Sequence, residues 1–148
     1  MNHPALRFLT LVLIVGGFIA ASSVLTALIT SRRTDDALRF AITVQGFATL
    51  FGPPFLLLLF RTLTKSRLRR GDGFAAAAAI VAAVPVSVWI FSHVVSVVAG
   101  VRLSGAGIRL LTAGLVVCAI GSILASVRFC EKSNQAMQPT AGRRDVDV

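Results

Sequence analysis

The chain has 148 residues, of which 55% are hydrophobic and 14% are charged, and its net charge is +9. Soluble domains usually contain about 25% charged residues, and a domain this small buries only about two thirds of its chain surface. The composition therefore excludes an ordinary water-soluble monomer and favours a protein whose solvent is lipid.

Four long segments without Asp, Glu, Lys or Arg follow one another at 8–31, 40–60, 73–101 and 110–127. A membrane-spanning helix needs about 20 mostly apolar residues. We therefore predict an all-α integral membrane protein with four transmembrane helices in an antiparallel bundle with short loops. The expected spans are about 8–30, 40–60, 74–100 and 109–127 within a domain of residues 1–130. We expect the remainder, 131–148, to be a disordered tail.

The first segment also resembles a signal peptide in part. Arg7 supplies a thin basic region before it, and "FIAASS" has the small residues of a cleavage site. The apolar sequence nevertheless continues through "VLTALI", beyond any such site. This continuation favours a retained first helix, and cleavage stays the alternative.

The second segment contains a proline pair and a large polar residue. Pro53 and Pro54 cannot donate backbone hydrogen bonds, so the carbonyls of Thr49 and Leu50 lose their usual helical partners. We expect a helix break at this pair, which bends the span. Gln45 is expected to hold helices together through hydrogen bonds.

The loop after the second segment is strongly basic. Five positive charges could bind a polyanion, but the loop is short and lacks the aromatic residues that stack on nucleic-acid bases. We predict contact with anionic lipid headgroups at the cytoplasmic face and no nucleic-acid partner. The "GDG" at 71–73 is expected to form a turn. The five basic residues are Arg61, Lys65, Arg67, Arg69 and Arg70.

The third segment carries Pro85, where we expect a second bend, and His93, the sole ionisable side chain in any of the four segments. An ionisable group inside a membrane is a candidate functional site. With Gln45, Ser92 and Ser96, His93 forms a candidate intramembrane polar site. A structural polar contact is the favoured interpretation, because no carboxylate lies in any span to relay a proton.

Small residues recur at every fourth position, which lets transmembrane helices approach closely. Ala75, Ala79 and Ala83 form one such strip, and Gly17 and Ala21 form another. The longest strip is expected to be a helix-packing face. It consists of Gly114, Cys118, Ser122 and Ser126.

The distribution of basic residues predicts the orientation. With four spans, the N-terminal arm, middle loop and tail share one side and carry ten Lys and Arg, against five in the other two loops. The positive-inside rule then places both termini in the cytoplasm. The tail piece "SNQAMQPTAGR" resembles an endpiece of unrelated bacterial proteins, which implies no activity and favours a bacterial inner membrane.

No catalytic constellation can be assembled from the sequence. His3 and His93 are far apart, and no nucleophile and base pair or metal-ligand spacing is evident. We therefore predict a protein that is not an enzyme and has no catalytic residue, metal or cofactor. The favoured function is an interaction or accessory subunit in a homo- or hetero-oligomer. The alternative is a small transporter or channel subunit that uses the broken second helix and the polar residues.

Overall fold

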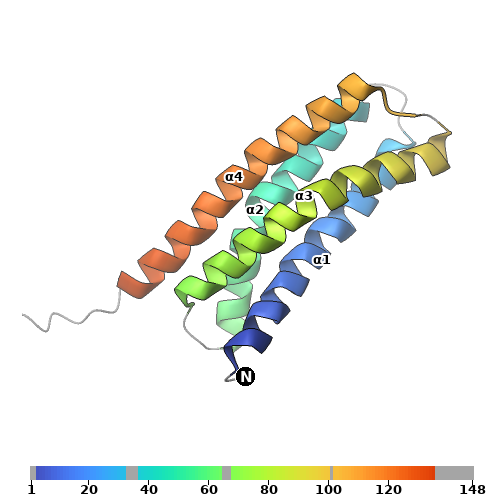
Figure 1. Ribbon diagram of the computed structural model, residues 1–148. Coiled ribbons are helices and arrows are strands. Elements are labelled where there is room, and N and C mark those ends of the chain that lie inside the picture. Colours follow the sequence, from blue (N-terminus) through green and yellow to red (C-terminus); the bar gives the residue numbers. More distant parts are fainter. Residues whose placement is uncertain (1–2, 33–36, 65–67, 101, 136–148) are drawn as a thin grey trace, which may run out of the picture.

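The computed structural model describes residues 3–32, 37–64, 68–100 and 102–135. These residues form four α-helices, α1 (Pro4–Thr30), α2 (Ala37–Thr64), α3 (Arg70–Ala99) and α4 (Gly105–Gln135), as Figure 1 shows. All four are long and apolar enough to cross a membrane. The all-helical class and the four helices are thus confirmed, and the described residues contain no strand.

The helices extend past the uncharged segments. α2 runs on to Thr64, and α4 runs to Gln135 through Arg128, Glu131 and Lys132. Arg, Lys and Glu are good helix formers, so a charge ends the apolar span without ending the helix. The prediction of a disordered tail from 131 is therefore wrong for 131–135. The segment 136–148 lies outside the described residues.

The "GDG" turn is also a wrong prediction. Helix α3 begins at Arg70, so 71–73 form its first turn. A carboxylate oxygen of Asp72 accepts the backbone N–H of Arg69 at 2.7 Å, which satisfies one of the unpaired donors at the helix start. The glycine with positive φ is instead Gly100 (φ 66°), which ends α3 in the left-handed conformation.

Helices α2 and α3 both continue through the prolines that they contain. Pro53 and Pro54 lie inside α2, and Pro85 lies inside α3. The expected helix break is therefore not an interruption of α2. Proline is tolerated in such helices where neighbouring segments pack against the disturbed turn. Pro53 is fully buried, which places the pair against the rest of the bundle.

Consecutive helices run antiparallel, but the most extensive contact joins two parallel helices, α1 and α3 (Figure 1). α1 packs mainly on α3. The contacts of α4 with α2 and with α3 are equally extensive. α2 and α3 touch weakly, so they occupy opposite corners of the bundle. The last residues of α2 and the first residues of α3 lie at the end of the bundle where α1 begins (Figure 1).

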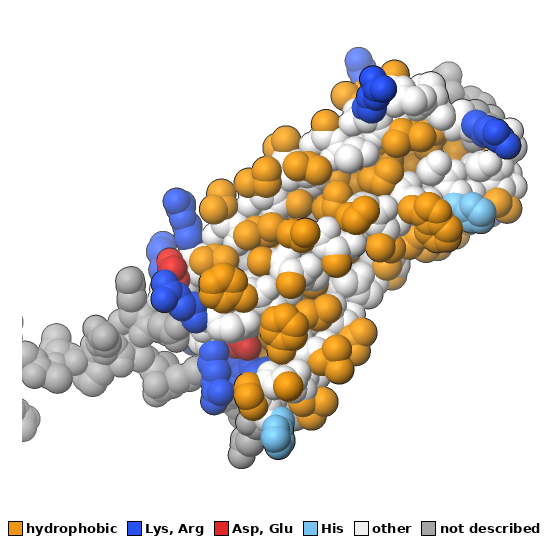
Figure 2. All heavy atoms as spheres, in the orientation of Figure 1, with side chains coloured by type: hydrophobic (Ala, Val, Ile, Leu, Met, Phe, Trp, Pro, Cys, Tyr) orange, Lys and Arg blue, Asp and Glu red, His pale blue; other side chains and the backbone are white. Residues whose placement is uncertain are grey.

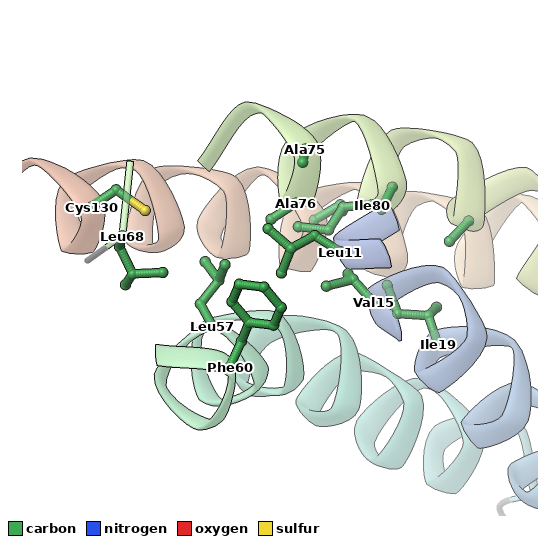
Figure 3. Packing of buried hydrophobic residues seen from close by; sticks show 13 residues of the cluster. Leu11, Val15, Ile19, Leu57, Phe60, Leu68, Ala75, Ala76, Ile80 and Cys130 are labelled. Atoms are coloured by element: carbon green, nitrogen blue, oxygen red, sulfur yellow. The ribbon is translucent and has the colours of Figure 1, made fainter. Parts of the chain in front are cut away.

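The core at this end is built from all four helices and the short link before α3 (Figure 3). α1 contributes Leu11, Val15 and Ile19, which face small side chains of α3 such as Ala76. Alanines allow the backbones of α1 and α3 to approach closely. A second cluster fills the opposite end, with Ala27, Ala41, Phe91, Val95, Leu111 and Leu115.

The outer surface carries many large apolar side chains. Leu13, Phe55, Val81 and Val117 are each more than 60% exposed, while the interior contains many Ala, Ser and Thr side chains. Figure 2 shows hydrophobic side chains along the length of the bundle and Lys and Arg at its two ends. Exposed apolar area on this scale is rare in soluble monomers. The arrangement fits a small multi-pass membrane protein.

Candidate functional site

Gln45 joins α2 to α1 through a buried polar cluster. Its side chain is 1% exposed. The amide nitrogen donates to Ser23 Oγ at 2.8 Å, to Ser22 Oγ at 3.1 Å and to the Ile19 carbonyl at 3.3 Å. The amide oxygen accepts from Thr26 Oγ1 at 3.3 Å. Both ends of the amide are therefore occupied by α1.

We expect Gln45→Leu to lower the free energy of unfolding by about 1–2 kcal/mol, the range of interhelical hydrogen bonds in membranes. Leucine has a side chain of similar volume but makes none of the hydrogen bonds of the Gln45 amide. The measurement is unfolding by denaturing detergent in mixed micelles. Thr43→Val is the matched control, because Thr43 is exposed and donates within α2 to the Arg39 carbonyl. Equal losses in the two variants would contradict a role for Gln45 in joining the helices.

His93 lies at the opposite end of the bundle from the N-terminus and lines a pocket of about 300 Å³ with Ser92 and Ser96. The imidazole stacks on the indole of Trp89, with ring centres 5.3 Å apart and an interplanar angle of 6°. Gln45 does not line this pocket. The predicted four-residue polar site is thus divided between a helix contact and a surface pocket.

Trp89 also lines this pocket, and three further residues complete its wall. Arg102 and Leu103 come from the connection between α3 and α4, and Ile108 comes from the first turn of α4. Arg102 is exposed, as is His93. The sequence prediction used Arg102 to assign orientation alone and missed its place beside His93. Its position just after the end of the third segment could have suggested this proximity.

The charges separate between the two ends of the bundle. In the part of the chain that the structure describes, the charged residues at the pocket end are all basic: Arg32, Arg39, Arg102 and Arg109. The described acidic residues, Asp72 and Glu131, lie at the other end and pair with arginines there. Asp35 and Asp36 lie outside the described residues.

The pair of Arg7 and Asp72 is a buried ion pair that the sequence analysis missed. Arg7 Nε donates to Asp72 Oδ1 at 2.9 Å, and Nη2 donates to Oδ2 at 2.6 Å. The residues are 9% and 4% exposed, and the guanidinium lies 5.3 Å from the centre of the Phe60 ring. A signal existed, because four spans place the sole acid of the middle loop beside the base of the N-terminal arm.

The remaining charges at this end lie closer to solvent. Arg69 and Arg70 are exposed and Arg61 is half-buried. Arg70 approaches Glu131 at 3.6 Å, where the side chain of Arg70 is exposed and that of Glu131 is half-buried. These arginines lie where the lipid contact was predicted, whereas Lys65 and Arg67 lie outside the described residues.

The small-residue strips lie mostly inside the bundle. A Cβ added at Gly114 would lie 3.0 Å from Ile42 of α2, and one at Gly46 would lie 3.1 Å from the Cys118 sulfur. Ser122 and Ser126 are fully buried, and Ala75, Ala79 and Ala83 are buried in α3. Gly17 and Ala21 of α1 are instead exposed on the outer surface.

Within the described residues, no three His, Cys, Asp or Glu side chains are grouped so that they could hold a metal ion. Comparisons of the chain with protein-family models, characterised proteins and solved structures find no match.

Proposed function

We propose that this chain is a non-enzymatic integral membrane protein that acts by associating with other transmembrane helices. The observation that carries the proposal is an apolar groove of about 180 Å³ on the outer surface between α1 and α3. Its walls are entirely apolar. They are formed by Val12, Gly16, Ala20, Ala79, Ala82, Ala83 and Val86.

The groove supports association because small residues line it and nothing fills it. A Cβ at Gly16 or Gly17 would meet no atom within 4 Å. In lipid, helices associate through close packing rather than hydrophobicity, and small residues let a partner backbone approach. The strip of α4, by contrast, packs within the chain itself. The groove therefore suits a transmembrane helix, from a second copy or from a different membrane protein.

The proposed orientation places both termini in the cytoplasm of a bacterial cell, with the protein in the inner membrane. Arg61, Arg69 and Arg70 then face the anionic cytoplasmic leaflet. Each such charge contributes on the order of 1 kcal/mol of attraction to acidic lipids. The excess of Lys and Arg on this side supports the orientation.

We expect Gly16→Leu to reduce association about tenfold, because the leucine side chain would fill the groove and a helix contact in lipid contributes 1–2 kcal/mol. The measurement is crosslinking and pull-down from native membranes. Ala113→Leu is the matched control, since Ala113 is exposed on α4, away from the groove. Complexes that persist unchanged in Gly16→Leu, or that weaken equally in both variants, would remove the groove as the contact.

A further inference from the structure

The pocket at the α3–α4 end has a composition unlike the rest of the surface. Its walls combine a guanidinium, an imidazole, an indole and two hydroxyls with the side chains of Leu103 and Ile108. All five polar groups can donate hydrogen bonds, and none of the described residues that line the pocket carries a carboxylate. A concave site of about 300 Å³ with a few convergent polar groups has the size of a small-ligand site.

The electrostatics of this pocket favour an anion. Arg102 supplies a permanent positive charge, and Arg32, Arg39 and Arg109 lie at the same end of the bundle. The C-terminal end of α3 and the N-terminal end of α4 both border the pocket, so their helix dipoles oppose one another. Among the described residues, the arginines therefore supply the net potential at the pocket.

The geometry points to a phosphate ester as the ligand, and we propose that this pocket binds the phosphate of a glycerophosphate group. A guanidinium recognises phosphate oxygens through paired N–H donors, and the hydroxyls of Ser92 and Ser96 add two more. The apolar side chains of Leu103 and Ile108 suit the glycerol carbons. The described lining residues offer no acidic partner for an ammonium, so a headgroup without an amine is preferred.

Two sources offer this chemistry. One is the headgroup of phosphatidylglycerol in the adjacent leaflet, an assignment that rests on the proposed membrane location. Trp89 is 66% exposed beside the pocket, and tryptophan is enriched at the level of lipid headgroups. The other source is a soluble glycerol phosphate that enters from the aqueous side.

Trp89 makes the proposal directly measurable, because it is the sole tryptophan of the chain and stacks on His93 in the pocket wall. The full chain in uncharged detergent is titrated with short-chain phosphatidylglycerol, with glycerol phosphate and with inorganic phosphate, at constant ionic strength. Short-chain phosphatidylcholine is the reference without net charge. We expect a saturable change in Trp89 fluorescence with phosphatidylglycerol or glycerol phosphate, and a weaker response to phosphatidylcholine.

Two variants that each remove one positive charge decide the assignment. Arg102→Gln is expected to weaken binding about tenfold, the effect of losing a charge-assisted pair. Arg109→Gln is the control, because Arg109 is exposed at the same end and does not line the pocket. It should change the affinity by less than about twofold, since an exposed charge in salt solution acts weakly at a distance. Arg102 is itself exposed, so neither variant should impair folding.

The outcomes distinguish a lipid headgroup from a soluble glycerol phosphate as the ligand. They also distinguish failure of the pocket proposal from failure of the groove proposal. Saturation by phosphatidylglycerol alone assigns a lipid headgroup, and saturation by glycerol phosphate assigns a soluble ligand as well. No saturable change with any of these probes, or equal weakening by Arg102→Gln and Arg109→Gln, would overturn the site. The pocket and the α1–α3 groove share no lining residue, so failure of the Gly16→Leu test would leave this titration unaffected.

Discussion

Asp72→Asn is expected to lower the free energy of unfolding by about 3–5 kcal/mol, because it removes the negative charge of Asp72 from beside the buried guanidinium of Arg7. Arginine stays protonated at any accessible pH, so it cannot avoid this cost by neutralising. The substitution also weakens the bond from the Arg69 backbone N–H that stabilises the start of α3. α1 and α3 should therefore loosen together at this end.

The measurement is the unfolding free energy in mixed micelles, with two comparison variants. Glu131→Gln breaks the exposed contact with Arg70 and should cost less than about 1 kcal/mol. The double variant Arg7→Met, Asp72→Asn also removes the buried positive charge of Arg7 and should recover part of the loss. A single Asp72→Asn variant as stable as the unmodified chain would show that the ion pair does not hold α1 against α3.

Gly52→Ala is expected to cost about 1–3 kcal/mol, the range of overpacking in a filled core. An added Cβ at this position of α2 would overlap the ring of Phe18 on α1. Gly52 is buried, and Pro53 and Pro54 follow it directly in α2. Because proline fixes its own backbone angle φ, the backbone at this position has little room to move. Phe18 is 39% exposed as a residue, so its ring can move outward in part, which limits the cost.

A double-mutant cycle tests this interpretation. In a Phe18→Ala background, the Gly52→Ala change should cost nothing further, because the overlapping ring is gone. Gly17→Ala is the control, since an added Cβ there meets no atom within 4 Å and alanine favours the helix by up to about 1 kcal/mol. Equal costs of Gly52→Ala in the two backgrounds would mean that Phe18 is not the obstacle.

The sequence was sufficient to predict the number of helices but insufficient to predict the residues at which they begin and end. Gaps in charge locate helices apolar enough to cross a membrane because lipid excludes charge, and all four such helices were found. Helix ends depend on backbone hydrogen bonds, which Arg128 and Lys132 continue as readily as leucine does. The same reasoning misjudged 71–73, where the side chain of Asp72 stabilises a helix start that two glycines disfavour.

The polar sites were predicted in part. Ser92, His93 and Ser96 belong to one stretch of helix, so their proximity followed from spacing alone. Gln45 was grouped with these three residues because it too is a polar residue in an apolar segment. Its hydrogen-bond partners are instead on α1 and include Ser22 and Ser23. Which helices are neighbours depends on packing across the whole bundle, and charge patterns do not encode it.

The central claim is that the four helices cross a bilayer with alternating direction. Topology reporters fused after Asp36 and after Lys65, one active outside the cytoplasm and one active inside, test it most directly in a bacterial host. The fusions after Asp36 should report the outside and those after Lys65 the cytoplasm. Both positions on the same side would contradict the claim, because α2 would then fail to cross the membrane.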